Sequence, residues 1–317
     1  MRKSSLLVYF CGGLGNQLFQ YAFARRLALE NDFELFADHL TGFARDVTYR
    51  RVFELNHIPG IHLKTATLIQ RFSVFSYFIC KKLLHYLPIF SYLFTNNEPA
   101  SQSLNYMRVF GRSFILEKKH SFIPEILHLP CQPSCLIGYW QSFSYIEPIS
   151  SLLLSELTPP PPSKKSLIRI GLKLRHSNSL ALGIRLYEDS PEPSVNCHGR
   201  NIKSLKSMHE QISLLQEQFP DLQIAVFCTH RPKCLDELVL HTDQTIFLTG
   251  DDGVASALDT LWLITHCRHH LFFNSTLYWW GAFLSQSIHG GPSNGQKIIA
   301  SDNFLNQSIY PSNWDLF

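Results

Sequence analysis

The sequence has no long apolar run and little net charge. No segment of its 317 residues supplies the ~20 uninterrupted apolar residues that a membrane-spanning helix needs. A net charge of +3 is too small for the electrostatic footprint of a nucleic-acid-binding protein, so no nucleic acid is expected as a partner. With 45% hydrophobic and 17% charged residues, the chain has the composition of a globular protein of roughly two domains.

Metal-binding patterns are also missing. The eight cysteines include one metal-like pair, CQPSC at 131–135, but no second pair to complete a zinc site. No Asp-x-Asp pair occurs, and the histidines of HCRHH at 266–270 straddle a predicted helix–strand junction. We therefore predict no metal site, and free thiols in a reducing compartment. The amino terminus resembles a secretory signal only briefly, because its apolar run is short and ends in glycines.

Four consecutive prolines in TPPPPSKK, at 158–165, predict a division into domains 1–157 and 158–317. Strands and helices alternate in the second half, which predicts a parallel sheet covered by helices on both faces. The strands are expected at 179–186, 222–229, 244–250 and 270–275, and the helices at 201–219, 233–241, 254–267 and 276–286. The first half begins in the same way, with LLVYF followed by a helix.

The aromatic and basic segment 72–94 has two interpretations. It forms either a packed helical pair or a surface that rests on a membrane.

Polar residues that directly follow strands are the candidates for a site, because ligands of doubly wound sheets bind at the carboxyl ends of strands. The first group is Gly12, Gly13, Gly15, Asn16 and Gln17. Glycines allow a ligand to approach the backbone, and Asn16 is expected to cap the helix that follows. The match to the Gly-x-Gly-x-x-Gly fingerprint of dinucleotide-binding proteins is weak, because Leu18 stands where the third glycine should be. The alternative to a binding site is a tight turn between strand and helix with no ligand.

Arg185 lies at the end of the strand predicted at 179–186, and Glu188 and Asp189 follow in the loop. A guanidinium pairs two phosphate oxygens at once, and a nearby carboxylate can act as a general base. A surface ion pair is the alternative.

Asn274, Ser275 and Thr276 begin the last predicted helix. Their hydroxyl and amide groups could bind an anion there, although ordinary helix capping explains them equally well. His230 follows another strand and could contact a guanine or phosphates, with a solvated turn as the alternative.

Together these motifs resemble the alpha-1,2-fucosyltransferase family. Gly12-Gly13-Leu14-Gly15-Asn16-Gln17-Leu18-Phe19-Gln20-Tyr21-Ala22 matches the family's opening motif. GYWQSFSYI at 138–146, the stretch 259–284 and the closing YPSNWDLF are similar to further family segments. One motif departs: the family's His-x-Arg-Arg-x-Asp is Gly183-Ile184-Arg185-Leu186-Tyr187-Glu188 here, which keeps only its first arginine and an acid. Phe227-Cys228-Thr229-His230 also replaces the family's Phe-Ser-Asp-Asp.

The resemblance implies an α/β fold of two Rossmann-like domains facing across a cleft, the GT-B type. It implies an inverting transfer of L-fucose from GDP-fucose to a galactoside hydroxyl of an acceptor glycan, with an alpha-1,2 linkage and neither metal nor cofactor. Arg185 would hold the diphosphate together with Asn274, Ser275 and Thr276, and Glu188 or Asp189 would be the base. Residues 12–17 would line the site beside the fucose and the acceptor.

The family also implies a cytoplasmic enzyme that modifies lipid-linked or lipopolysaccharide sugars, with peripheral contact at the inner face of the membrane. Three alternatives remain at this point: a decayed homologue that binds a GDP-sugar or glycan without turnover, a transferase of another GDP-sugar such as GDP-mannose, and an NAD-linked oxidoreductase.

Overall fold

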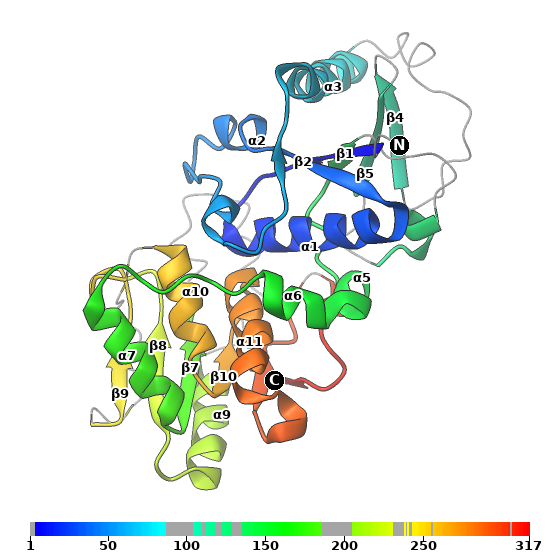
Figure 1. Cartoon of the computed structure of the whole chain (residues 1–317). Coiled ribbons are helices and arrows are strands. Elements are labelled where there is room, and N and C mark those ends of the chain that lie inside the picture. The colour runs from blue at the N-terminus through cyan, green and yellow to red at the C-terminus, as the bar shows by residue number, and fades with distance from the viewer. Residues whose placement is uncertain are drawn as a thin grey trace. The chain divides into compact units, whose positions relative to one another are not determined.

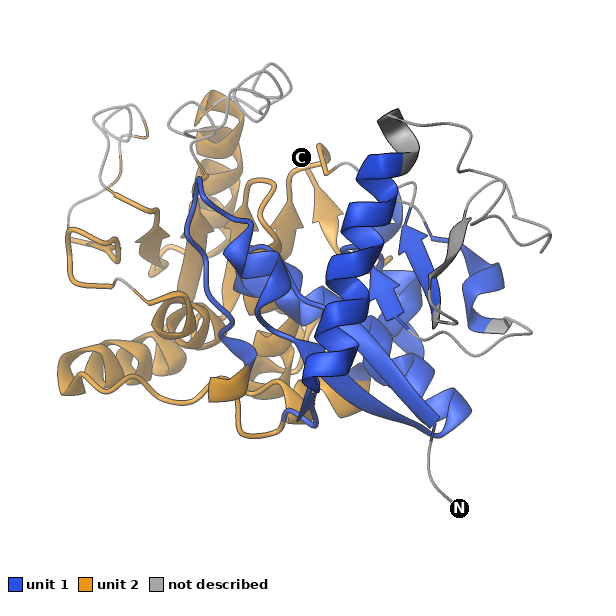
Figure 2. Cartoon of the chain, turned by 90° about the horizontal axis from the view of Figure 1, so that it is seen from above, with its two compact units in different colours: residues 1–55, 61–150, 306–309 blue, residues 56–60, 151–305, 310–317 orange. Residues whose placement is uncertain are grey.

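The computed structural model describes residues 4–86, 104–109, 112–117, 122–128, 135–185, 205–230, 238, 240, 243–254, 256–304 and 306–317. The chain forms two compact units, which Figure 2 colours separately. The first comprises residues 1–55, 61–150 and 306–309, and the second comprises 56–60, 151–305 and 310–317. The chain thus enters the second unit just before the proline run that the sequence suggests as the division, and a short stretch near the carboxyl terminus returns to the first.

The first unit is built on a six-stranded sheet in the order β3-β2-β1-β6-β5-β4. All neighbouring strands are parallel except β4 and β5, which are antiparallel. The strands are β1 (Ser4–Tyr9), β2 (Phe33–Asp38), β3 (Lys64–Thr65), β4 (Leu104–Val109), β5 (Arg112–Glu117) and β6 (Cys135–Ile137). The helices are α1 (Leu14–Asn31), α2 (Thr41–Ala44), α3 (Leu68–Tyr86) and α5 (Phe143–Ile146), with short 3-10 turns at Pro124–His128, Glu147–Ile149 and Gln307–Ile309.

Helices α1 and α3 cover opposite faces of this sheet (Figure 1). Alternate residues of a strand point to opposite faces, and Leu7 and Tyr9 of β1 pack against Val74 and Tyr77 of α3. Helix α1 is buried on more than one side, including the polar Gln17 and Gln20. It is therefore a core helix, and its polar residues must find partners inside the protein.

The second unit contains six parallel strands in the order β12-β11-β10-β7-β8-β9. They are β7 (Ser179–Gly183), β8 (Gln223–Phe227), β9 (Thr245–Phe247), β10 (His269–Phe272), β11 (Ile298–Ala300) and β12 (Asp315–Leu316). The helices are α6 (Ser150–Glu156), α7 (Lys165–His176), α9 (Leu205–Gln218), α10 (Ala257–Thr265) and α11 (Thr276–His289), with 3-10 turns at Leu55–His57 and Pro292–Asn294. Numbered from β7, the strand order is 3-2-1-4-5-6, which is the order of dinucleotide-binding domains.

Both faces of the second sheet are covered. Leu180 and Leu182 of β7 pack with Met208 and Ile212 of α9. Gly183, which points to the other face, lies against Tyr278 of α11. This arrangement is the doubly wound one that the alternating pattern predicts, because α9, which comes after β7, and α11, which comes after β10, cover opposite faces of the sheet.

The α/β class with two Rossmann-like units is confirmed. That the units face each other across a cleft stays a prediction. The strand expected at 179–186 ends earlier, at Gly183, and the helix expected at 254–267 is limited to Ala257–Thr265. The helix expected at 233–241 lies largely outside the described residues, as does segment 72–94 beyond Tyr86.

Within the described ranges, no helix is long and apolar enough to cross a membrane. The five described cysteines, at positions 11, 80, 135, 228 and 267, form no disulfide with one another.

Candidate functional site

In the first unit, the glycine-rich turn connects β1 to α1. Gly12 has a φ of +80°, and a Cβ atom there would lie 2.6 Å from the Asn16 Nδ2 atom, so both its conformation and its surroundings require glycine. Helix α1 begins at Leu14, and Gly13 is its N-cap residue without any side-chain cap. The expectation that Asn16 caps the helix is therefore wrong, because Asn16 already lies in the first turn.

Gln17 fixes the shape of this turn. Its Nε2 atom donates to the Gly12 and Val52 carbonyl oxygens at 3.0 and 2.8 Å, and its Oε1 atom accepts from the Glu54 backbone N–H at 2.9 Å. The side chain is completely buried. Its amide therefore holds the glycine turn against the segment 52–54, and the substrate contact that the sequence suggests for Gln17 stays a prediction.

Two other amides join the ends of β1 and β6. Gln20 accepts from the Cys11 N–H at 3.2 Å and donates to the Gly138 carbonyl at 3.0 Å. Asn16 accepts a hydrogen bond from Gln141 Nε2 at 2.9 Å. The order of the sheet reverses between β1 and β6, so these bonds lie at the switch point where ligands of such sheets bind.

A charged group beside the glycine turn, Arg51, is one that the sequence analysis missed. The Arg51 Nε atom lies 3.7 Å from the position that a Cβ atom of Gly13 would take, and the Arg51 guanidinium stacks 4.1 Å from the ring centre of Tyr49. A guanidinium beside a helix amino terminus favours oxygen-rich ligands. Burial raises the pKa of the neighbouring Cys11 thiol, which keeps this thiol protonated.

In the second unit, the register of β7 and β10 places two predicted site residues, Arg185 and Asn274, at the same distance beyond the last paired residues of these strands. Gly183 of β7 pairs with Phe272 of β10, and the Phe273 N–H donates to the Gly183 carbonyl at 3.0 Å. Arg185 and Asn274 each lie two residues beyond this pair. The sheet order reverses between β7 and β10, so Arg185 and Asn274 flank the switch point.

Tyr278, a buried residue of α11, supports this end of the sheet, and the sequence analysis did not identify it. Its buried hydroxyl lies 3.2 Å from the Ile184 carbonyl oxygen and 3.0 Å from that of Phe227, and can donate to either. These carbonyls directly precede Arg185 and the Cys228–His230 turn. Burial raises the pKa of Tyr278 well above its ordinary value, so the hydroxyl remains a donor.

The remaining predicted residues are distributed as follows. Ser275 is the N-cap residue of α11, yet its side chain makes no capping bond. Asn274 donates to the Asn303 carbonyl at 3.0 Å, and the half-buried His230 follows β8. Glu188 and Asp189 lie outside the described residues, so their role as base stays a prediction.

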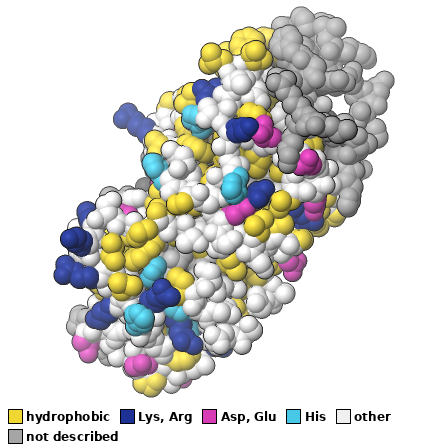
Figure 3. All heavy atoms as spheres, in the orientation of Figure 1, with side chains coloured by type: hydrophobic (Ala, Val, Ile, Leu, Met, Phe, Trp, Pro, Cys, Tyr) yellow, Lys and Arg dark blue, Asp and Glu magenta, His cyan; other side chains and the backbone are white. Residues whose placement is uncertain are grey.

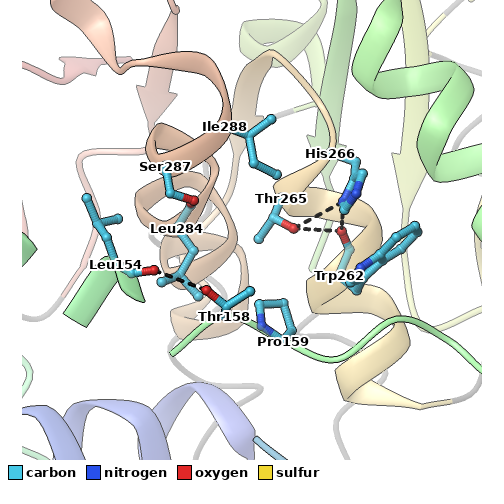
Figure 4. Close-up of a pocket in the computed structure, with 9 residues that line it drawn as sticks. All are labelled: Leu154, Thr158, Pro159, Trp262, Thr265, His266, Leu284, Ser287 and Ile288. Atoms are coloured by element: carbon cyan, nitrogen blue, oxygen red, sulfur yellow. Dashed lines mark hydrogen bonds between the residues drawn. The ribbon is translucent and has the colours of Figure 1, made fainter. Parts of the chain in front are cut away.

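The histidines of segment 266–270 serve the core. The His269 Nε2 and Asn178 Oδ1 atoms lie 2.8 Å apart, and the His269 Nδ1 atom accepts from the Lys297 N–H at 3.0 Å. The His266 Nδ1 atom lies 2.8 Å from the Trp262 carbonyl oxygen, beside a small hollow between α6, α10 and α11 (Figure 4). In the described part of the chain, no three His, Cys, Asp or Glu side chains are grouped so that they could hold a metal ion.

Comparison with known proteins places these observations in context. No family model matches the chain. It is 25% identical over 295 residues to an alpha-1,2-colitosyltransferase from Escherichia coli, a similarity that covers 89% of this chain and 88% of that protein.

Solved structures with a similar arrangement include an Arabidopsis thaliana FUT1 variant in complex with GDP, with 12% identity, a TM-score of 0.47 and coverage of 94% of this chain and 70% of that one. They also include the fucosyltransferase NodZ from Bradyrhizobium, with 13% identity, a TM-score of 0.43 and coverage of 90% and 94%, respectively.

Proposed function

We propose that this chain is a glycosyltransferase that uses a GDP-sugar. The observation that carries the proposal is the position of Arg185 and Asn274 on the two sides of the switch point in the second sheet. The full-length similarity to a colitosyltransferase supports it. The second unit would bind the donor, and the glycine turn of the first unit would bind the acceptor sugar.

The chemistry of such a reaction suits these residues. A departing nucleoside diphosphate gains negative charge, which must be stabilised in the transition state. Arg185 offers a planar guanidinium for two phosphate oxygens. The amino terminus of α11, which Ser275 leaves without a side-chain cap, offers backbone N–H groups and a favourable dipole. The acceptor hydroxyl would displace the diphosphate and invert the anomeric carbon, with Glu188 or Asp189 as the base and without a metal.

The second unit argues against an NAD-linked oxidoreductase, although its strand order is that of dinucleotide-binding domains. The fingerprint of such domains needs a glycine-rich turn after the first strand. In the sequence, the next glycine after Gly183 is Gly199, so the glycine spacing of the fingerprint is missing, and the Tyr278 ring occupies the space beside Gly183. The pyrophosphate of a dinucleotide cofactor needs close contact with the backbone of such a turn, and the Tyr278 ring beside Gly183 does not favour that contact.

For the transferred sugar, we propose L-fucose and an alpha-1,2 linkage to a galactoside of a lipid-linked or lipopolysaccharide acceptor. The motif match to the alpha-1,2-fucosyltransferases supports this choice. The colitosyltransferase relative supports a second candidate, transfer of colitose with the same linkage. A decayed protein that only binds a GDP-sugar would share the donor site but show no turnover.

The test is thermal stabilisation of the purified protein by GDP, GDP-fucose, GDP-mannose, UDP and NAD in the presence of EDTA. A ligand that binds only the folded state raises the melting temperature by mass action. Stabilisation by GDP and GDP-fucose, and its loss in Arg185→Ala, is the expected result. The matched control is Arg169→Ala, which removes an exposed arginine of α7 in the same unit. Absence of a shift with every guanine nucleotide would contradict the proposal.

A further inference from the structure

Helix α3 is apolar on two opposite faces. Its inner face, with Val74, Tyr77 and Cys80, packs against the sheet of the first unit. Its outer face carries large apolar side chains that are between 43% and 81% exposed, namely Leu68, Ile69, Phe72, Phe75, Ile79 and Leu83. We call this outer set the α3 stripe.

The α3 stripe is continuous along the helix. Leu68, Phe72, Phe75, Ile79 and Leu83 follow one another at intervals of three or four residues, which places them on one side of an α-helix. Figure 3 shows hydrophobic side chains on the surface at the top of the view, where Figure 1 draws α3. A large exposed apolar patch of this kind usually marks an interaction surface.

The stretch of sequence that contains α3 carries charges of one sign. No aspartate or glutamate occurs between Glu54 and Glu98. Lys81 and Lys82 are exposed near the end of the helix, and Arg71 lies one turn before Phe75. Lys82 follows Phe75 by two helical turns and thus borders the stripe. A cationic border around an apolar face is complementary to anionic lipid headgroups above an acyl layer.

We propose that α3 lies in the plane of an anionic membrane surface, with the α3 stripe inserted at the boundary between headgroups and acyl chains. Phe72 and Phe75 would insert into this boundary, while Lys82 and Arg71 contact lipid phosphates and Lys81, at the end of the helix, adds to the positive charge near the surface. The basic residues within α3 suit contact with a membrane surface better than passage across it. This inference concerns where the protein works, and it does not depend on which sugar is transferred.

The test is co-sedimentation of the full-length protein with vesicles. One set contains phosphatidylglycerol and phosphatidylcholine in equal parts, and the other contains phosphatidylcholine alone. The wild type should bind the anionic vesicles, more weakly at high salt, and bind the neutral ones poorly. The variants Phe72→Ser/Phe75→Ser and Lys81→Glu/Lys82→Glu should each bind the anionic vesicles with an affinity at least about tenfold lower than that of the wild type.

The matched control is Leu172→Ser/Leu214→Ser, which removes two leucines of the second unit that are 43% and 58% exposed. It should bind like the wild type. All variants should keep the melting temperature, because the altered side chains are exposed, and sedimentation analysis should show monomers.

Three outcomes would overturn the proposal: no binding of the wild type to anionic vesicles, equal loss in the control, or a dimer that Phe72→Ser/Phe75→Ser dissociates. The last would assign the stripe to a second copy of the chain. The assay involves no sugar transfer, so its failure would leave the proposed function standing.

Discussion

The substitution Gly183→Ala tests how the edge of the second sheet is built. A Cβ atom at this position would lie 2.6 and 2.7 Å from the Cδ2 and Cγ atoms of Tyr278, and 2.9 Å from the Phe272 Cβ atom. Ordinary contact begins near 3.4 Å, so the tyrosine ring would have to retreat by about 0.8 Å. Its hydroxyl is hydrogen-bonded to the carbonyls of Ile184 and Phe227, so that movement also weakens these bonds.

Overpacking costs about 1–3 kcal/mol, and a weakened buried hydrogen bond adds about 1 kcal/mol. We therefore expect Gly183→Ala to lower the free energy of unfolding by about 2–4 kcal/mol. The same shift displaces the backbone before Arg185, so stabilisation by GDP should decrease as well. Urea unfolding with and without GDP measures both effects.

A double-mutant cycle with Tyr278→Ala provides the control. Alanine removes both clashing atoms, Cγ and Cδ2, so Gly183→Ala should cost less in that background, and the two effects should not be additive. If Gly183→Ala unfolds within about 0.5 kcal/mol of the wild type and keeps its response to GDP, the supporting role of Tyr278 is refuted.

Three further predictions follow from buried or sequence-predicted polar groups. Gln17→Ala should destabilise the protein by about 2 kcal/mol in urea unfolding, because it removes one buried and two part-buried hydrogen bonds to the backbone of Gly12, Val52 and Glu54. Asn16→Ala, which removes the hydrogen bond from Gln141, should cost about 1 kcal/mol; equal effects would contradict the assigned role of Gln17. Burial lowers the pKa of His269 to about 4, so only the unfolded state gains a proton as the pH falls below about 6.5. Stability should therefore be lost between pH 6.5 and 4, and a urea midpoint unchanged between pH 7 and pH 5 would count against this. Of Glu188→Gln and Asp189→Asn, the one that removes the base should reduce turnover with little change in GDP affinity, and two fully active variants would exclude both residues as the base.

The sequence alone predicted the type of β1 and α1 in the first unit, the type of β7 to β10 and of α9 to α11 in the second, and the sheet ends that carry polar residues. Alternating strands and amphipathic helices require a parallel sheet with two covered faces, which the second unit has. The glycines at 12 and 13 indicate a sharp strand-to-helix turn, because only glycine adopts the left-handed conformation at low cost. These inferences depend on local chemistry and on hydrophobic period, which need no distant contact.

Only the tertiary structure decided which residues become partners. Gln17 looks like a ligand-binding amide in sequence, but it is buried because α1 is enclosed on several sides, and two of its three hydrogen-bond partners described above lie 35 and 37 residues away in the chain. Arg185 and Asn274 lie at the same distance beyond the paired residues of β7 and β10 because of the register between these strands. In the sequence, these two strands are separated by α9, β8, β9 and α10. The spacing of apolar residues in α3 does not show which of its two apolar faces is buried. Its inner face packs on the sheet, and this packing leaves the outer face exposed. Contacts between distant segments fix these features, and no local pattern encodes them.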